Sequence, residues 1–409
     1  MRRVVVSGYG VGSAYGFGAE ALRQGLKSGR SAVKRLDGFS AYQGLHSHVG
    51  ASIDADLELK SIPRIYRRSM GRVAQFAALA ALEAREMSGL DDDVIKSPST
   101  ACIMGSTMGS AGALNEAFQS IVKDNNLAEI SGMQFFKCVS HTVVMNTAQF
   151  LGINGCILCP AAACASSLQA IGLGMQLIRS GTIDVAFCGG AEELSALVTG
   201  TFDSLMAASC SYNDRPELAS RPFDAKRDGL VCGEGAGVLV LESLDSALKR
   251  KAKIYCELTG YNTCGNASHI SQSDSTSVSR CIHAALADAG VNTSEVDYIS
   301  AHATATLQGD AAEARALADI FGENIPVSSM KGGLGHTLGA SGALETIAVL
   351  MMMDEQLIYP TMNLDTVADD CKGLDHVSEL REQSIDIFVK NCFAFGGINA
   401  VVVGRRYTA

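Results

Sequence analysis

The sequence predicts an α/β protein in which sheets and helices are stacked in layers. Short runs of β-branched and other apolar residues alternate with longer segments whose apolar residues recur at helical intervals, a pattern typical of layered α/β architecture. The same order of strand, turn and helix occurs twice along the chain. Of the 409 residues, 47% are hydrophobic and only 19% are charged, so we expect a large buried core.

The expected strands are short apolar runs bounded by turn-forming residues. From the amino terminus, we expect strands near Val4–Ser7, Thr100–Met104, Gly155–Leu158, Asp184–Cys188, Gly237–Leu241, Ile254–Tyr261, Asp297–Ser300, Val327–Ser329, Asp386–Lys390 and Ala400–Gly404.

The expected helices are longer segments with apolar residues on one face. Behind Cys164, for example, Leu168, Ile171 and Met175 follow helical spacing, and Gly181 ends the segment as a glycine near a helix terminus usually does. We expect helices around Ala19–Ser28, Arg72–Ser88, Ala165–Ser180, Val278–Ala289, Ala311–Ile320 and Gly342–Glu355.

Two halves with the same order of elements are expected. A unit of strand, turn, long helix and strand at 155–188 is repeated at 325–360, and the strand that ends at Gly105 corresponds to the strand that ends at His302. We therefore expect an amino-terminal half, residues 1–250, and a carboxy-terminal half, residues 251–409, related by a pseudo-twofold axis. No flexible linker separates them, which favours one compact unit.

Composition excludes several classes of function. A net charge of −10 argues against a nucleic-acid binder, and the apolar runs are too short for a membrane span or a signal peptide. The thirteen cysteines, an odd number without a regular framework, fit a reducing compartment. We therefore expect a cytoplasmic protein.

Cys164 is the candidate nucleophile. It lies between an apolar run and a helix, in the stretch Pro160-Ala161-Ala162-Ala163-Cys164-Ala165-Ser166-Ser167, and we expect it on a turn at the helix start. Unpaired backbone N–H groups and the helix dipole at such a place favour the thiolate and lower the cysteine pKa. The alternative is a small buried cysteine without a catalytic role, which is common among free cysteines.

Two histidines and a lysine favour the catalytic interpretation. His302 directly follows one expected buried strand, and Lys331 and His336 follow another, separated by a glycine-rich turn. Functional groups of α/β proteins gather at the carboxyl ends of strands, where loops open onto a crevice. A set of one cysteine, two histidines and one lysine in this setting indicates a catalytic site.

Three further motifs have ordinary explanations. The segment Asn391-Cys392-Phe393-Ala394-Phe395-Gly396-Gly397-Ile398-Asn399 could be a movable lid, or an ordinary turn with phenylalanines in the core. The spacing of Cys156 and Cys159 suits a metal, but zinc needs four ligands, no second pair is present, and a buried strand is expected here. The glycines at 105 and 109 match no phosphate-binding pattern.

A basic cluster on this acidic chain could attract an acidic partner. Arg64, Arg67, Arg68 and Arg72 surround Tyr66. Most such clusters are only solvated surface, but a local positive field raises the encounter rate with a negatively charged protein.

With these motifs in view, the chain resembles the β-ketoacyl-[acyl-carrier-protein] synthases, which are condensing enzymes with a thiolase-like five-layer αβαβα fold. The resemblance covers essentially the whole chain. It is most specific around Ala163–Ser167, His302, Ser329–His336 and Phe393–Asn399, and Tyr212–Asp214 with Arg221–Gly229 indicates the synthase I/II branch. That branch uses a cysteine, two histidines and a lysine.

The resemblance implies a role for each candidate residue. Cys164 would accept the acyl group, His302 and His336 would assist decarboxylation, and Lys331 would hold the set electrostatically with support from Glu345. The backbone N–H groups of Cys164 and Phe395 would form the oxyanion hole, in the lid segment that also contains Phe393. Thr304 and Thr306 would bind the phosphopantetheine arm, and Met108 would lie at the deep end of the partner subunit's acyl pocket. Arg64 and Arg68 would contact the carrier protein.

The family reaction is the decarboxylative condensation of malonyl-carrier protein with an enzyme-bound acyl group, and it implies several partners. We expect acyl carrier protein as substrate, a homodimer or a heterodimer with a related chain-length subunit, and no metal. No cofactor is expected beyond the phosphopantetheine arm of the carrier. A thiolase acting on coenzyme A thioesters is the alternative, although the segment from Lys331 to His336 has no place in it.

Three departures from the family pattern indicate a specialised synthase. The usual His-Gly-Thr-Ser-Thr-Pro is His302-Ala303-Thr304-Ala305-Thr306-Leu307 here, and Lys331 is followed by Gly-Gly-Leu instead of Ser/Ala-Met-Thr. In the lid, Cys392, Ala394 and Ile398 replace Ser, Gly and Thr, and Ala394 stiffens a hinge. The catalytic side chains are kept while their frame changes, so the expected pathway is either fatty acid biosynthesis or a specialised polyene or polyketide pathway.

Overall fold

The computed structural model describes residues 1–54, 61–128, 130–267, 270–271 and 273–408. In these residues, twelve strands form one mixed sheet. They are β1 (Val4–Ser13), β2 (Gly16–Phe17), β5 (Thr100–Gly105), β6 (Ile157–Leu158), β7 (Val185–Glu192), β8 (Gly235–Ser243), β9 (Cys256–Gly265), β10 (Tyr298–Ser300), β11 (Pro326–Ser328), β13 (Asp375–His376), β15 (Ile387–Ala394) and β16 (Ile398–Arg405). Two small sheets pair β3 (Lys34–Arg35) with β4 (Val49–Gly50), and β12 (Leu357–Ile358) with β14 (Arg381–Glu382).

The helices include all six that the sequence predicts. Those six are α1 (Ala19–Lys27), α3 (Arg72–Ser88), α8 (Ser166–Arg179), α11 (Ser275–Ala289), α12 (Leu307–Phe321) and α14 (Ser341–Glu355). The sequence analysis missed α2 (Arg64–Arg67), α4 (Asp92–Ile95), α5 (Ala111–Asp124), α6 (Gly132–Cys138), α7 (Thr142–Leu151), α9 (Ala196–Ser204), α10 (Leu244–Lys249) and α13 (Lys331–Leu334). The last of these was expected as a turn; it is a one-turn helix that ends at Gly335, whose φ of 65° suits glycine.

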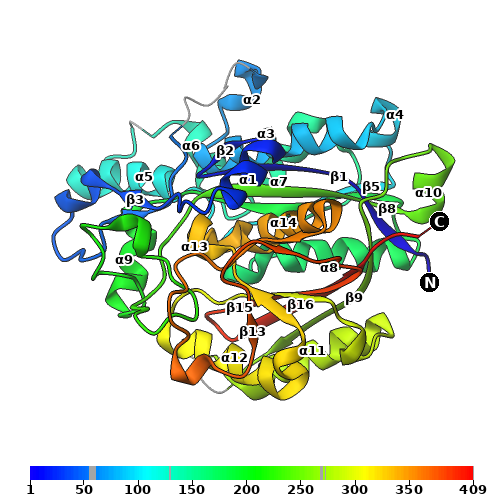
Figure 1. The fold of residues 1–409 in the computed structure, drawn as a ribbon. Coiled ribbons are helices and arrows are strands. Elements are labelled where there is room, and N and C mark those ends of the chain that lie inside the picture. Colours follow the sequence, from blue (N-terminus) through cyan, green and yellow to red (C-terminus); the bar gives the residue numbers. More distant parts are fainter. Residues whose placement is uncertain (55–60, 129, 268–269, 272, 409) are drawn as a thin grey trace.

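Five layers are visible in Figure 1, and they confirm the predicted αβαβα architecture. Helices α3 and α7 cover one outer face, over β1, β5 and β8. Helices α8 and α14 lie in the middle, and the strands β9, β15 and β16 lie on their other side. Helix α11 closes the opposite outer face against β9 and β16, with α12 beside it.

The pairing of the strands is repeated in the two parts of the sheet. In the set β6-β5-β7-β8-β1, the first two pairings are parallel and the last two are antiparallel. The set β11-β10-β15-β16-β9 has the same pattern of pairings. The two sets join where Val4–Val6 of β1 pair with Cys256–Leu258 of β9. The expected division near residue 250 falls between these sets, after α10, and remains a prediction.

The second repeated unit ends later in the chain than the sequence suggested. We expected its last strand by residue 360, but β12 at that place pairs only with β14 in a separate small sheet. The first strand after α14 in the main sheet is the short β13, which pairs with β11 at the edge of the sheet. The long strand β15, which pairs with β10 and β16, comes after it. The apolar run at Leu357–Ile358 resembles a strand of the main sheet, and the segment between it and β15 is an insertion in the repeat.

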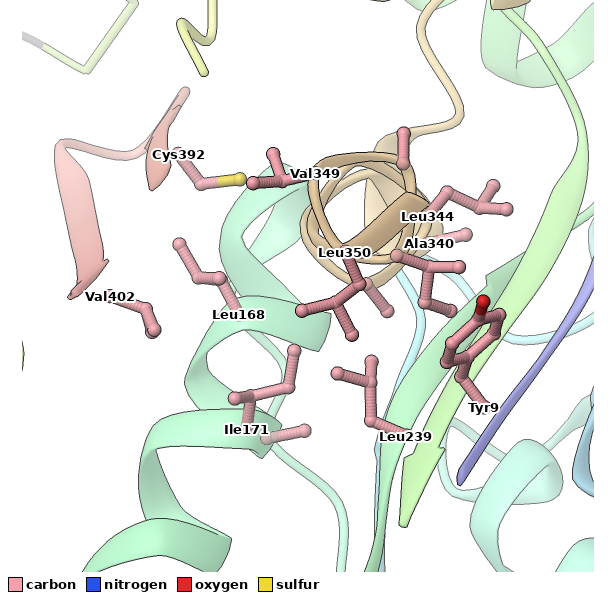
Figure 2. Packing of buried hydrophobic residues seen from close by; sticks show 14 of the residues in the cluster. Tyr9, Leu168, Ile171, Leu239, Ala340, Leu344, Val349, Leu350, Cys392 and Val402 are labelled. Carbon is pink, nitrogen blue, oxygen red and sulfur yellow. The ribbon is translucent and has the colours of Figure 1, made fainter. Parts of the chain in front are cut away.

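The middle layer buries α14 on every side. All residues from Ser341 to Met353 are buried, including the acid Glu345, as expected for a helix that is apolar all round. Figure 2 shows Leu344, Val349 and Leu350 of this helix packed among Leu168 and Ile171 of α8 and residues of the flanking strands. A carboxylate is therefore held at the centre of the molecule by a rigid element.

Both middle helices start from the same strained turn. A 3₁₀ turn at Ala163–Ala165 precedes α8, another at Leu338–Ala340 precedes α14, and the first residue of each has φ of 46°. This left-handed conformation is unfavourable for a residue with a Cβ, and such strain of about 1–3 kcal/mol is found mainly where function requires it. The helices approach closely at these starts, since a Cβ on Gly342 would lie 2.7 Å from Leu168.

Strand β6 was predicted as a buried strand, which is wrong. It is the last strand on its side of the sheet, and Ile157 and Leu158 are 47% and 37% exposed. An apolar run predicts burial but does not show whether the cover comes from the same chain. An exposed apolar edge strand presents unpaired backbone groups with which another chain can pair.

Candidate active site

The nucleophile candidate lies at the strained turn before α8. Cys164 is the middle residue of the 3₁₀ turn, and α8 begins two residues later, at the predicted place. Ser166 fixes the turn, because its hydroxyl accepts from the backbone N–H of Ala162 and donates to the carbonyl of Ala163. The small side chains around Cys164 allow this sharp turn and leave the sulfur facing a cavity.

The structure brings Cys164, His302 and His336 together from three segments far apart in sequence. The Cys164 Sγ lies 3.0 Å from His336 Nε2, and the two imidazole rings are 5.2 Å apart at 83°. One ligand atom from each of the three residues lies within 4.8 Å of the others. Such spacing would also suit a metal ion, but the ammonium groups of Lys331 and Lys390 act on the same site and disfavour a cation there.

Burial sets the protonation of this set. It raises the pKa of the Cys164 thiol to about 12, although the charge of Lys331 acts in the opposite direction. Our expectation of a lowered cysteine pKa is thus wrong for the resting site, because the loss of hydration outweighs the helix start. Burial and then Lys331 lower the pKa of His336 to about 3, and the same causes hold the pKa of His302 well below its usual value. Cys164 is therefore a thiol beside two neutral imidazoles.

A buried carboxylate lies between two buried lysines behind the histidines. Glu345 Oε1 is 2.7 Å from Lys331 Nζ, and Glu345 Oε2 is 2.6 Å from Lys390 Nζ. Burial alone would raise the pKa of Glu345, but the two ammonium charges lower it to about 2. The predicted pair of Lys331 and Glu345 is therefore a group of three, and Lys390 is a member that the sequence analysis missed.

Two acids of α12 fix the backbone that carries His302. Glu313 accepts hydrogen bonds from the N–H groups of His302 and Ala303, at 2.8 and 2.7 Å, and Asp310 accepts from Thr304 N–H at 2.9 Å. Both acids are buried and lie three residues apart on one face of the helix. That spacing, in the helix directly after the His302 segment, is a signal that could have revealed them in the sequence.

A cavity of about 350 Å³ connects the site with the surface. Cys164, His302 and His336 line its inner part, and the exposed residues Met206 and Leu307 line its mouth. Thr304 and Thr306 lie along the wall, with their hydroxyl oxygens 3.1 Å apart. Both threonines therefore line the cavity, and their role as ligands of the phosphopantetheine arm stays a prediction.

The lid segment is the hairpin between β15 and β16. Phe393 is buried with its ring 6.1 Å from that of His302, whereas Phe395 is partly buried, lines the cavity and lies 5.7 Å from the ring of Phe202. Gly397 has φ of 72°, and a Cβ there would lie 2.2 Å from the Asn266 carbonyl oxygen. The segment is therefore both a turn anchored by core phenylalanines and a wall of the site.

The remaining predicted residues lie outside this cavity. Met108 follows β5, is partly buried and packs against the main core, but it does not line the cavity within one chain. Arg64 and Arg68 are exposed at the two ends of α2, and neither forms an ion pair with any residue that the structure describes. Arg72, from the same basic cluster, pairs instead with Glu234 at 2.6 Å.

Among the described residues, no helix combines the length and apolarity that a membrane-spanning segment requires.

Comparison with known protein families gives two matches that cover most of the chain. The beta-ketoacyl synthase N-terminal domain matches residues 1–247, and the beta-ketoacyl synthase C-terminal domain matches residues 255–365. The 3-oxoacyl-[acyl-carrier-protein] synthase 1 of Haemophilus influenzae is 36% identical over 409 residues and covers both chains completely. The actinorhodin polyketide putative beta-ketoacyl synthase 1 of Streptomyces coelicolor is 35% identical over 99% of this chain and 88% of its own.

Solved structures agree with this assignment. A beta-ketoacyl synthase from Burkholderia phymatum superimposes with a TM-score of 0.97 at 37% identity over both whole chains. The ishigamide ketosynthase/chain length factor gives 0.93 at 32% identity, also over both whole chains. The type II polyketide synthase complex AntDE:AntF, which holds an acyl-carrier protein, gives 0.91 at 30% identity over 99% of this chain and all of that one. With this fold and these matches, the chain belongs to the beta-ketoacyl synthase family.

Proposed function

We propose that this protein joins an acyl group, held as a thioester on Cys164, to the two-carbon unit of malonyl-carrier protein. The observation that carries the proposal is the contact of 3.0 Å between Cys164 Sγ and His336 Nε2, beside His302, in a cavity that reaches the surface. Family membership supports the same reaction.

The first step transfers the acyl group to the enzyme. The neutral imidazole of His336 accepts the thiol proton of Cys164, and the sulfur attacks the thioester carbon of the acyl-carrier protein. The bond from that carbon to the carrier's sulfur breaks, and the leaving thiolate takes up the proton. Backbone N–H groups of Cys164 and Phe395 are proposed to stabilise the oxyanion.

The second step forms the carbon–carbon bond. Malonyl-carrier protein loses CO₂, and the electron pair of the broken bond becomes an enolate whose oxygen accepts hydrogen bonds from His302 and His336. Each such preorganised donor is worth about 3–4 kcal/mol in the transition state. The enolate carbon attacks the Cys164 thioester, the carbon–sulfur bond breaks, and the Cys164 thiolate takes up one proton from solvent, the proton that the overall condensation consumes. The product is a β-ketoacyl-carrier protein, and the reaction needs no cofactor beyond the carrier's phosphopantetheine arm.

Acyl carrier protein and a second subunit are the proposed partners. Arg64 and Arg68 are exposed and free to meet an acidic carrier. The exposed apolar edge strand β6 supports a homodimer, or a heterodimer with a chain-length subunit like the one named in the ishigamide structure. The thirteen cysteines are free, which supports a reducing compartment and hence the cytoplasm.

A specialised polyene or polyketide pathway is the proposed setting. The sequence departures around His302, Lys331 and the lid support it, and the relatives include both fatty-acid and polyketide synthases by name.

Intact-protein mass spectrometry after incubation with a panel of acyl-carrier proteins tests the function. One acyl adduct on Cys164, followed by its loss and a product two carbons longer when malonyl-carrier protein is added, is expected. Condensation of acetyl-coenzyme A without malonyl-carrier protein would instead identify a thiolase.

A further inference from the structure

Lys390 is a fully buried cation for which the proposed reaction has no assigned role. It lies on β15, three residues after Ile387, in a strand that is otherwise apolar up to Asn391. Its ammonium group has three oxygen partners: Glu345 Oε2 at 2.6 Å, the carbonyl of Asn391 at 2.6 Å and the carbonyl of Ala301 at 3.5 Å. An ammonium group has three donors, so each donor has an acceptor.

These partners connect Lys390 to the segment that carries His302. Ala301 directly precedes His302, so the ammonium group holds the backbone on one side of the histidine. Asn391, the next residue of β15, donates to Glu313 Oε1 at 3.1 Å, and the same oxygen accepts from His302 N–H at 2.8 Å. Two consecutive residues of β15 therefore hold the backbone around His302. Lys390 binds the carbonyl of Ala301, and Asn391 binds the carboxylate of Glu313, which in turn binds the N–H of His302.

Lys390 also compensates a buried negative charge. Lys331 and Lys390 share the carboxylate of Glu345, and Glu313 is a further buried acid next to the His302 segment. The cost of burying an ion is high unless its partners compensate for the lost hydration. Burial alone would lower the pKa of Lys390, but Glu345 raises it, so this lysine is charged inside the protein. Without Lys390, Lys331 would be the one ion-pair partner left to Glu345 among the described residues.

Among the described residues, buried ionisable groups from several elements lie in this region. They are Cys164 before α8, Glu313 and Asp310 on α12, Lys331 on α13, Glu345 on α14, Lys390 and Cys392 on β15, and Glu192 at the end of β7. Of these, Lys331 and Lys390 act on both imidazoles, and Glu345 acts on His336. Lys390 lowers the pKa of both His302 and His336, as Lys331 does.

We propose that Lys390 is a positioning residue for the condensing reaction: its ammonium group ties the His302 segment to the pair of Glu345 and Lys331. This inference rests on the proposed function, since it assumes that His302 and His336 act together on malonyl-carrier protein. Lys390 touches no substrate in this arrangement, and it acts through Glu345 and the backbone of Ala301.

The test compares two steps of the reaction in Lys390→Met and Lys390→Gln variants of the full-length protein. Lys390→Met removes the charge and all hydrogen-bond donors while keeping a side chain of similar length. Lys390→Gln removes the charge but keeps an amide donor for Glu345. The glutamine variant therefore decides the test if the methionine variant does not fold. Lys372→Met is the matched control, because Lys372 is exposed and, among the described residues, its ion pair is with Asp369, three residues earlier on the surface. Loading of Cys164 by acyl-carrier protein is measured by intact mass, and decarboxylation by CO₂ release from malonyl-carrier protein.

The rate of decarboxylation should fall by about 10- to 100-fold in both variants at pH 7, because this step needs both His302 and His336 in their correct positions. The KM for malonyl-carrier protein should stay unchanged. Loading of Cys164 should fall by less than about threefold, since it needs only His336. The low-pH side of the loading profile should move to higher pH, because the charge of Lys390 lowers the pKa of His336 and the variants lack that charge.

Equal losses in loading and decarboxylation, with an unmoved low-pH side of the loading profile, would show a purely structural role and overturn the inference, as would wild-type rates in either variant. The wild-type protein and Lys372→Met should decarboxylate malonyl-carrier protein at the same rate. If the wild-type protein itself does not decarboxylate this substrate, the proposed function has failed instead.

Discussion

Replacing Glu345 with glutamine removes one negative charge from the centre of the protein while keeping the shape of the side chain. Glu345 binds two ammonium groups, at 2.7 and 2.6 Å, and also accepts a hydrogen bond from Ser341. We expect the variant to lose stability and most of its condensing activity, because Lys331 and Lys390 would both be left without their shared partner.

The size of the stability loss follows from the ionisation of Glu345. Its pKa is lowered from the usual 4.5 to about 2 by Lys331 and Lys390, against the effect of burial. This difference corresponds to about 3 kcal/mol of stabilisation at neutral pH, since each pH unit is worth about 1.4 kcal/mol. Breaking a buried ion pair by removing one partner costs about 3–5 kcal/mol, which agrees.

The direction of the pH dependence also follows. The folded-state pKa lies below the unfolded-state value, so the wild-type protein holds this stabilisation above about pH 4.5 and loses it as the pH falls toward 2. The difference in unfolding free energy between wild type and Glu345→Gln should therefore be largest at pH 7 and should narrow below pH 4.5.

Urea unfolding followed by circular dichroism at pH 7, 5, 4 and 3 measures this difference. Glu323→Gln is the control, because Glu323 is exposed and its replacement should change stability by less than about 0.5 kcal/mol. A loss smaller than about 1 kcal/mol at pH 7, or a difference that does not narrow in acid, would refute the role of the two lysines in stabilising the carboxylate.

Further predictions concern single steps of the reaction. Cys164→Ala should abolish the acyl adduct in intact mass spectra, and any adduct of the same mass on this variant would contradict the assignment of the nucleophile. His336→Ala should slow CO₂ release from malonyl-carrier protein by about 100-fold or more, as loss of one preorganised donor does; an unchanged rate would remove His336 from the mechanism. Gly397→Ala should lower both steps, because a Cβ would lie 2.2 Å from the Asn266 carbonyl oxygen, whereas Gly265→Ala, whose Cβ would meet nothing within 4 Å, should not. The double change of Arg64 and Arg68 to glutamate should raise the KM for the carrier protein at low salt, and a KM that does not respond would place the docking surface elsewhere.

The sequence predicted the layered fold because its periodic patterns are long. Helix α3 was placed without error, and α8 and α14 to within one residue at each end, since each has a sustained apolar pattern. Helix α7 was missed because its first turn, Thr142-Val143-Val144, has β-branched residues that do not indicate a helix. Strand β6 was placed correctly along the chain, but an apolar run cannot show that its outer edge is exposed.

Part of the candidate site could be predicted because several of its residues stand at the ends of predicted elements. Cys164, His302, Lys331 and His336 stand at the ends of expected strands or helices, so their convergence could be anticipated from the layered fold. Lys390 could not, because a lysine at a strand end is usually solvated, and its partner Glu345 is 45 residues away in sequence. The cysteine pKa was misjudged because the helix start is visible in the sequence whereas the degree of burial is not.

Isotope-labelled malonyl-carrier protein offers the most direct test of the central claim that Cys164, His302 and His336 act as one site. Wild-type protein loaded with an unlabelled acyl group should lose that adduct from the Cys164 peptide and release a β-ketoacyl product with both labelled carbons of the malonyl unit at its carrier end. An acyl group found on another cysteine, or an adduct on Cys164 that persists while labelled CO₂ is released, would contradict the account.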